Sequence, residues 1–531
     1  MTSLTIRNLS VTPLELTQVE RYEADAVQNA KGVTDFVWGF LRMPIDYLTG
    51  CGANPAGGST GSGLMPKEGA PPTSTDAVTD VRIGAFTTAR TSVKAPNLTS
   101  EVLRLTFKAE FGGGAAHKTY TVDVPAASPR SIELHPVEGQ GDGQGNQEAA
   151  AASFSAVYTA SGAHLAIMSS AALDRWMATV DGSWPLSSLS LPGTHNSPAF
   201  HYALPSVRCQ AVDLREQLDN GVRFFDVRVS VNPPKQPHAD PRLTLVHSVF
   251  PVGLLGSHTF SELYDAVCGF LDAHPTETVL VSIKREGTGK GTDADLAHQL
   301  MNHYTGGPAD LNKERPAGSE SRRKEGGQPE PWRWYTESRI PSLNEARGRI
   351  VLIRRFGLPD EDAFKQIHNG SGWGLDGSVW PDNCEDGLCG TGQMRLQDFY
   401  DVLQTTTIDI KINYVRGLLA KSASANYSKI GDPNGVSAAT IPPLFINFLT
   451  GSNFFNARCW PENVAAKVNP SVIEYLCVQH NETSTEGPNN VPAPGGDGST
   501  GIVVTDWVGH RGDWDLLRCI VAWNARLQMK Q

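Results

Sequence analysis

The sequence lacks any long hydrophobic run. No uninterrupted stretch reaches the length of about 18 apolar residues that a bilayer-spanning helix requires, which argues against a transmembrane segment. The first ten residues, MTSLTIRNLS, also lack the basic and then apolar pattern of a signal peptide. We therefore expect a cytoplasmic or peripheral membrane protein, with secretion by another route left open.

Cysteine and positive charge are also scarce. The 8 cysteines are widely spread and form no double CxxC motif, which argues against a cysteine-based zinc scaffold and favours reduced thiols. Cys384 and Cys389 are close enough in sequence to pair in an oxidising setting. The formal net charge of -11 argues against nucleic acid as a partner and against a purely electrostatic hold on anionic membranes.

The length of 531 residues predicts two domains. Residues 1–165 contain short segments rich in β-branched and aromatic residues, such as EVLRLTFKAEF and KTYTVDV, separated by Gly- and Ser-rich stretches. We predict a β-sandwich-like accessory domain with Gly/Pro-rich loops over this range. The apolar segment 35–48, DFVWGFLRMPIDYL, suits lipid docking or burial against the sandwich, and its three charged residues favour burial.

From about residue 180 the pattern changes to alternating strands and helices. Thr259 and Glu262 have the spacing of a capping box, and Pro275 ends the helical pattern that follows. The predicted strands LTLVH and TVLVSIK flank this helix, and such βαβ units build parallel sheets and (β/α) barrels. We predict an α/β domain over residues 166–531, with a polar, solvated insertion near 305–332.

Titratable side chains gather where the predicted strands end. Alternation along the strand VRFFDVRV places its aspartate and arginine on one face. Two histidines, a lysine, a glutamate and a second aspartate lie close to the C-terminal ends of other predicted strands. These ends form the catalytic face of (β/α) barrels, so the pattern indicates an active site, although a structural ion pair would also explain the aspartate and arginine. The residues are His195, Asp226, Arg228, His247, Lys284, Glu286 and Asp506.

Two histidines and one arginine suit the cleavage of a phosphodiester by a neighbouring hydroxyl without a metal. One histidine takes a proton from the attacking hydroxyl, and the other gives a proton to the leaving oxygen. The arginine neutralises charge that builds on the phosphoryl group. A buried carboxylate such as Asp506 can fix the tautomer of one histidine and stabilise its protonated form.

In combination, these motifs resemble the catalytic X-domain of phosphatidylinositol-specific phospholipase C, in its bacterial, metal-independent branch. The resemblance covers roughly residues 180–531, and its strength lies in the order of its segments. The family fold is a distorted, partly open TIM barrel, which the resemblance implies for this chain. The matching segments are LPGTHNS, GVRFFDVR, LVHSVF, ETVLVSIKRE, ARGRIVLIRRF, WPDN, LQDFY and FINF.

The resemblance also implies roles for individual residues. His195 would be the general base on the inositol 2-hydroxyl, and Asp506 would orient it. Arg228 would bind the phosphate, and His247 would be the general acid toward the diacylglycerol oxygen. The residues at or near the substrate-binding positions of the family are Asp226, Lys284, Glu286, Arg355, Trp380, Asp398 and Tyr400.

Asn196 departs from the metal-independent branch, which usually carries an aspartate directly after the first histidine. Calcium-dependent relatives have an asparagine there as a metal ligand, but they use carboxylates where this chain has Arg228 and Lys284. Two cations would repel a divalent ion, so we expect neither a metal nor another cofactor. Without the charge of the aspartate, the pKa of His247 should be lower.

We predict a phosphodiesterase that cleaves phosphatidylinositol, or its glycosylated derivatives, at a membrane surface. Its products would be diacylglycerol and inositol 1,2-cyclic phosphate. A degenerate barrel that only binds a lipid or polyol is one alternative, but binding alone gives no reason to keep two histidines and an orienting carboxylate. A metal-dependent glycerophosphodiesterase is another, but it needs carboxylates where Arg228 and Lys284 stand.

Overall fold

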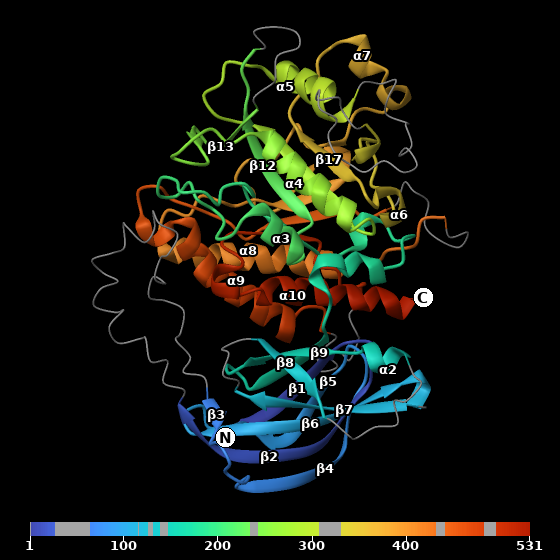
Figure 1. Cartoon of the computed structure of the whole chain (residues 1–531), viewed down its shortest axis with the longest axis vertical. Coiled ribbons are helices and arrows are strands. Elements are labelled where there is room, and N and C mark those ends of the chain that lie inside the picture. The colour runs from blue at the N-terminus through green and yellow to red at the C-terminus, as the bar shows by residue number, and fades with distance from the viewer. Residues whose placement is uncertain are drawn as a thin grey trace, which may run out of the picture.

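The computed structural model describes residues 2–26, 64–114, 116–125, 131–137, 147–233, 243–306, 331–431, 441–482 and 495–530. Its strands form one sheet of ten strands and one of twelve, and helices accompany the second (Figure 1). The fold is mixed α/β, as the sequence predicts. The apolar segment 35–48 and most of the polar insertion near 305–332 lie outside the described residues. Within the described ranges, no helix combines the length and apolarity needed to cross a bilayer.

The ten-stranded sheet has the order β3-β2-β6-β7-β8-β9-β10-β1-β5, with β4 beside β2. Its pairs are antiparallel except for β1 with β10. Alternate residues of β6, such as Leu103, Leu105 and Phe107, are buried in a core that this sheet encloses. The prediction of a sandwich over residues 1–165 stays a prediction. The strands are β1 (Ser3–Leu9), β2 (Leu14–Ala26), β3 (Leu64–Pro66), β4 (Ser74–Ile83), β5 (Thr88–Lys94), β6 (Glu101–Phe111), β7 (Ala116–Val124), β8 (Ser131–Pro136), β9 (Phe154–Thr159) and β10 (His164–Ser169).

The twelve-stranded sheet is largely parallel, and its order follows the chain around a curve. From β11, the strands β12, β15, β17 and β18 lie successively on one side, while β22, β21 and β20 lie on the other. The first parallel strand therefore pairs with the last one. The strands are β11 (Leu191–Thr194), β12 (Phe224–Ser230), β13 (Thr244–His247), β14 (Phe250–Pro251), β15 (Val279–Arg285), β16 (Trp334–Tyr335), β17 (Ile350–Arg355), β18 (Leu375–Asp376), β19 (Gly387–Cys389), β20 (Met394–Gln397), β21 (Leu444–Phe448) and β22 (Ile502–Thr505).

Helices cover the outer face of this second sheet. The predicted capping box of Thr259 and Glu262 begins α4, which ends two residues before Pro275. Phe225 and Val227 of β12 pack in the core shared with the helices, whereas Phe224 faces the other core, as strand alternation predicts. The helices are α2 (Gln147–Ala151), beside the first sheet, and α3 (Leu214–Asp219), α4 (Phe260–Ala273), α5 (Asp293–Leu300), α6 (Leu343–Ala346), α7 (Asp362–Lys365), α8 (Thr405–Ala423), α9 (Pro461–Val478) and α10 (Asp515–Ala522).

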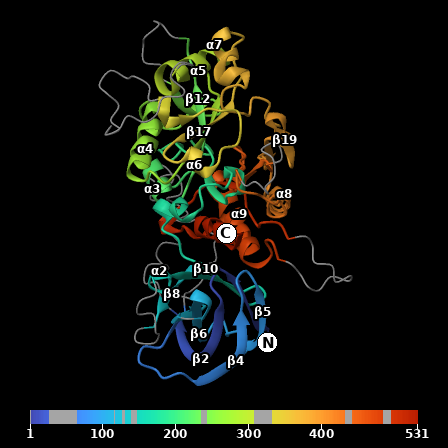
Figure 2. The same cartoon turned by 90° about the vertical axis from the view of Figure 1, so that its right-hand side faces the viewer.

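Helices α9 and α10 lie between the two sheets in Figure 1, and Figure 2 shows α9 in the same place. The buried guanidinium of Arg7, in β1, donates to the carbonyl oxygens of Cys477 at 3.3 Å and His480 at 2.6 Å. Met168 of β10 belongs to the same core cluster as residues of α9 and α10. The two sheets are therefore joined by an apolar and hydrogen-bonded contact.

Candidate active site

The predicted site residues lie at one edge of the twelve-stranded sheet. His195 and Asp506 directly follow the neighbouring parallel strands β11 and β22, and Arg228 and Lys284 are paired residues of β12 and β15. The carboxyl ends of parallel strands meet at the same edge, so these side chains converge. Gly193 lets β11 lie close to β12, because a Cβ at this position would be 2.9 Å from the ring of Phe224.

His195 is paired with a buried carboxylate. Its Nδ1 lies 3.0 Å from Oδ1 of Asp506, and its Nε2 lies 4.0 Å from Oδ2 of Asp226. Burial raises the pKa of Asp506, while the nearby His195 and Arg228 oppose that shift. A carboxylate at Nδ1 fixes the tautomer in which Nε2 carries the lone pair. This nitrogen can therefore accept a proton.

Gln210 supports this pair, although no motif in the sequence predicts it. Its side-chain nitrogen donates to the backbone oxygens of His195 at 2.7 Å and Thr505 at 3.0 Å, and lies 3.5 Å from Oδ1 of Asp506. The side chain is fully buried. Gln210 thus ties the ends of β11 and β22 together behind the His195–Asp506 pair.

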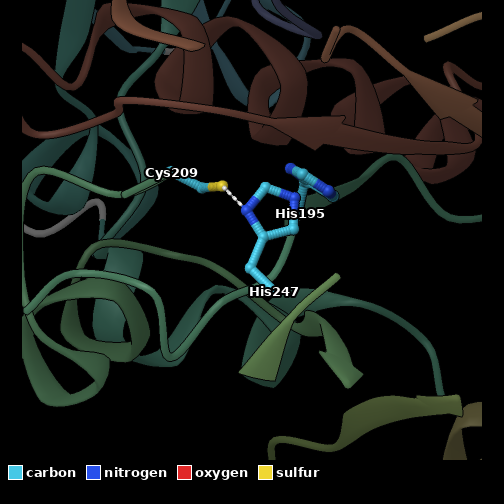
Figure 3. Close-up of side chains that lie close together, drawn as sticks. All are labelled: His195, Cys209 and His247. Carbon is cyan, nitrogen blue, oxygen red and sulfur yellow. Dashed lines mark hydrogen bonds between the residues drawn. The ribbon is translucent and has the colours of Figure 1, made fainter. Parts of the chain in front are cut away.

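His247 faces His195 without a carboxylate at its Nδ1. The ring centroids are 5.4 Å apart at an interplanar angle of 79°. Nδ1 of His247 lies 3.0 Å from the carbonyl oxygen of Val207 and 3.6 Å from Sγ of Cys209, with His195 on the other side of the ring (Figure 3). Because a carbonyl only accepts, Nδ1 carries a proton, and Nε2 is left for exchange with a ligand.

Burial, Arg228 and His195 lower the pKa of His247 to about 3. The direction agrees with the expectation drawn from Asn196, but the first cause is burial. The side-chain nitrogen of Asn196 donates to the carbonyl of Val246 at 3.1 Å, and its backbone N–H donates to Asp226 at 3.1 Å. Asn196 therefore holds the backbone before His247.

Arg228 is fixed between two carboxylates. Its guanidinium lies 3.3 Å from Oδ2 of Asp226 and 3.3 Å from Oε1 of Glu286. Arg355 also pairs with Asp226 at 3.3 Å, and Lys284 pairs with Glu286 at 2.6 Å. Five predicted residues therefore form one continuous network of charges.

These pairings control the protonation of both carboxylates. Burial alone would raise the pKa of Asp226, but Arg228 and Arg355 hold it well below the usual range of an aspartate. Burial would likewise raise the pKa of Glu286, but Arg228 and Lys284 lower it to about 2. Both carboxylates are ionised near neutral pH, and their charge is already shared with guanidinium or ammonium groups.

Trp380 and Asp398 contact Arg355, and we call these two residues the second wall of the site. Trp380 lies under the guanidinium of Arg355, with 3.8 Å between its ring centroid and the guanidinium carbon, and its Nε1 donates to Asp398 at 2.9 Å. Arg355 approaches the same carboxylate at 3.9 Å. Tyr400 is 43% exposed and donates to Asp382 at 2.8 Å instead.

Two further buried groups near the site were not predicted. Nζ of Lys411, on α8, donates to Oε1 of Gln397 at 3.2 Å, and burial lowers its pKa to about 7. Cys209 is a buried free thiol, and burial raises its pKa well above the ordinary value. Its sulfur and one nitrogen each of His195 and His247 lie within 4.8 Å of one another, so these three side chains could hold a metal. Cys384 and Cys389, considered above as a pair, are both free thiols.

Comparisons with known proteins found relatives, although no family model matches the chain. A 1-phosphatidylinositol phosphodiesterase of Staphylococcus aureus (strain Newman) is 25% identical over 326 residues, which are 59% of this chain and 86% of the relative. A 1-phosphatidylinositol phosphodiesterase of Listeria monocytogenes is 25% identical over 193 residues, which are 35% of this chain and 50% of the relative.

Solved structures of phosphatidylinositol-specific phospholipase C are similar to this chain at lower identity. One from Staphylococcus aureus is 22% identical with a TM-score of 0.46, and the match covers 66% of this chain and 97% of the other. The enzyme from Listeria monocytogenes is 17% identical with a TM-score of 0.41, and the match covers 66% of this chain and 98% of the other.

Proposed function

We propose that this chain, a member of the phospholipase C-like phosphodiesterase family, cleaves phosphatidylinositol or its glycosylated derivatives. The family predicted from the sequence motifs is confirmed by the curated relatives. The structural observation that carries the proposal is the facing pair of His195 and His247, 5.4 Å apart between ring centroids, with Asp506 on one side and Arg228 held nearby. The products are diacylglycerol and inositol 1,2-cyclic phosphate.

In the proposed reaction, His195 is the base. Its Nε2 takes the proton of the inositol 2-hydroxyl while the hydroxyl oxygen forms a bond to phosphorus. The hydrogen bond from Nδ1 to Asp506, 3.0 Å long, stabilises the imidazolium that results. Asp226, with Oδ2 at 4.0 Å from Nε2, adds a second favourable charge.

Arg228 binds the phosphate. Its guanidinium is held on two sides by Asp226 and Glu286, so the group is oriented before the substrate arrives. A preorganised cation at the phosphoryl oxygens stabilises charge that develops in the transition state. Asn196 contributes indirectly, because its backbone N–H fixes Asp226 and its side chain fixes the backbone next to His247.

His247 is the proposed acid. The bond between phosphorus and the glycerol oxygen breaks as Nε2 of His247 gives its proton to that oxygen. In the free protein, the low pKa of about 3 keeps this imidazole neutral at physiological pH. A bound phosphodiester anion favours the protonated form, so the substrate itself recruits the acid. The proton balance closes when His247 takes back the proton held by His195, directly or through water.

In this proposal, the inositol ring binds between the charged network and the second wall. Hydroxyl groups pair with the ionised carboxylates and the cations, and the flat ring of Trp380 suits the apolar C–H surface of a polyol. Arg355 belongs to the charged network and also contacts Trp380 and Asp398 of the second wall. We therefore expect the network and the second wall to contact the same substrate. The residues assigned to this binding are Asp226, Lys284, Glu286, Arg355, Trp380, Asp398 and Tyr400.

Exposed apolar side chains near the same edge of the sheet suit a lipid surface. We name Leu255, Val379, Leu403 and Phe455, in segments that follow β14, β18, β20 and β21, the apolar rim. Their exposed fractions are 80%, 81%, 64% and 95%. The stacked rings of Phe250 and Phe454, 6.1 Å apart, link β14 to the segment that follows β21. With a net charge of -11, apolar insertion is a better hold on a bilayer than charge attraction, so we assign a peripheral membrane role.

We propose the same relationship for the architecture of the chain. The curved parallel sheet, in which β11 pairs with β22, is a distorted, partly open (β/α) barrel over residues 166–531. We propose an accessory β-sandwich domain over residues 1–165, whose strand β1 contacts α9 and whose last strand, β10, contacts α9 and α10. A cytoplasmic location for the protein stays a prediction.

Phosphorus NMR of phosphatidylinositol vesicles incubated with the protein in excess EDTA tests this function. We expect a five-membered cyclic phosphate to appear with the wild type and to be lost with His247→Ala. Activity that requires added calcium would contradict the roles given to Arg228 and Lys284. Vesicle binding without any product would indicate the lipid- or polyol-binding alternative.

A further inference from the structure

We propose that His195, Cys209 and His247 form an inhibitory site for a thiophilic divalent cation of the zinc class. The binding site stands on the geometry alone, whereas its inhibitory consequence rests on the proposed function. This cation is distinct from any cofactor, because the proposed reaction needs the same two imidazoles free of metal.

The first support is the distance between the ligand atoms. The sulfur of Cys209 and one nitrogen of each histidine lie within 4.8 Å of one another, and Sγ lies 3.6 Å from Nδ1 of His247 (Figure 3). Zinc bonds of about 2.3 Å to sulfur and about 2.0–2.1 Å to nitrogen put two tetrahedral ligand atoms roughly 3.5 Å apart. The thiol and the imidazole therefore already have the spacing of two zinc ligands.

The second support is the environment of the three ligands. Asp506 accepts a hydrogen bond from Nδ1 of His195, and Gln210 lies against Asp506. A carboxylate that holds the far side of an imidazole is a common second-shell arrangement in zinc sites, because it fixes the ring and strengthens the ligand. All three ligands are buried or nearly so, and the free thiol makes no disulfide.

The ligand types select among metals. One thiol and two imidazoles suit zinc and similar borderline metals, whereas calcium and magnesium prefer oxygen. The nearby carboxylates of Asp226 and Glu286 are paired with Arg228, Arg355 and Lys284. These ion pairs would have to break before either carboxylate could bind the metal. When the cation binds, the S–H bond of Cys209 breaks and its proton passes to water, and the proton on Nδ1 of His247 is replaced by one on Nε2, so that Nδ1 is free to bind the metal.

Binding and catalysis exclude each other at His195. A cation bound to the ring takes the lone pair that would accept the proton of the attacking hydroxyl. Cys209 and His247 also both approach the carbonyl oxygen of Val207, at 3.4 Å and 3.0 Å, and a metal bound at Sγ and Nδ1 replaces these contacts. The occupied site is therefore inactive until the metal is removed.

Calorimetric titration with Zn²⁺ and absorption titration with Co²⁺ test the site without reference to activity. We expect one zinc per wild-type chain and a thiolate-to-cobalt charge-transfer band. Cys209→Ala should lose the band and bind zinc at least about tenfold more weakly. Cys209→Ser, which preserves the size of the side chain, guards against a folding artefact. Cys459→Ala removes a buried thiol elsewhere and should behave like the wild type.

Equal zinc affinity in the wild type and both Cys209 variants, or cobalt binding without the charge-transfer band, would overturn the proposal. In a separate assay, added zinc should inhibit phosphatidylinositol cleavage, and EDTA should restore it. The inhibition is measured within each variant against its own metal-free rate. Failure to cleave the lipid in EDTA would refute the proposed function while leaving the metal-binding result intact.

Discussion

The surroundings of His195 and His247 differ in what each ring meets at Nδ1. His195 meets a carboxylate oxygen of Asp506 at 3.0 Å, whereas His247 meets the carbonyl oxygen of Val207 at 3.0 Å and the thiol of Cys209 at 3.6 Å. A carboxylate stabilises a protonated imidazole, while a carbonyl mainly fixes its orientation. The first region is built to receive a proton, and the second holds a neutral ring until an anion arrives.

We expect the largest loss of activity when the carboxylate beside His195 is replaced. In Asp506→Asn, the amide can pair with the wrong tautomer of the ring and no longer stabilises the imidazolium. We expect kcat to fall by about 10³- to 10⁴-fold, measured with phosphatidylinositol vesicles. Asp513→Asn changes a nearby acid that follows the same strand, and it should have little effect. A loss smaller than tenfold in Asp506→Asn would mean that His195 is not the base.

The second prediction separates the two histidines by the leaving group. His247→Ala should reduce cleavage of phosphatidylinositol by roughly 10²- to 10⁴-fold, because the diacylglycerol oxygen needs a proton. An inositol nitrophenyl phosphodiester, whose leaving group needs no proton, should recover most of that loss. His195→Ala should remain slow with both substrates. Equal losses in both variants with the activated substrate would remove the distinction between acid and base.

Gln210 offers a smaller test of the His195 region. Gln210→Leu removes the donors to the backbone of His195 and Thr505 and the contact with Asp506. We expect a decrease of about tenfold in kcat and a changed acid limb of the pH profile, because His195 and Asp506 are less well aligned. Gln299→Leu is a matched control: this glutamine is also buried and donates to the carbonyl of Asn232. Identical pH profiles in both variants would indicate a purely structural role.

The smallest predicted effect is a shift between two pH profiles of the wild type. The acid must be protonated to act, and the pKa of His247 in the free protein is about 3. A bound phosphodiester raises this pKa, so the ionisation of His247 should occur at higher pH in the profile of kcat, which reports the complex, than in that of kcat/KM, which reports the free protein. We expect a displacement of at least about one pH unit. The same ionisation in both profiles would show that the substrate does not recruit the acid.

Much of this arrangement follows from strand patterns. Alternation in VRFFDVRV places Asp226 and Arg228 on the face opposite Val227, and the parallel pairing of β12 with β15 brings Arg228 beside Lys284. The polar ends of such strands can be predicted, because a buried strand has few other places for a charge. Most residues of the ion-pair network can therefore be predicted from the local sequence of the strands.

The residues that reach the site from other segments were not predictable in the same way. Cys209 and Gln210 belong to an irregular segment, and their positions depend on backbone hydrogen bonds between Cys209 and both Ala199 and Trp507. Lys411 looks like one more polar residue of a helix until α8 is placed against β20 and β21. The partners of Asn196 and Tyr400 likewise depend on which loop lies opposite, and a motif carries no information about that.

The pairing of β11 with β22 also has a consequence for the order in which the protein assembles. His195 and Asp506 are 311 positions apart in the chain, and their hydrogen bond joins the ends of the first and the last parallel strands of the sheet. Contacts of such long sequence separation carry a high entropic cost and slow the folding of a chain. During refolding, helical content should therefore return well before catalytic activity. The pair of His195 and Asp506 forms only after two strands that are far apart in the sequence have paired.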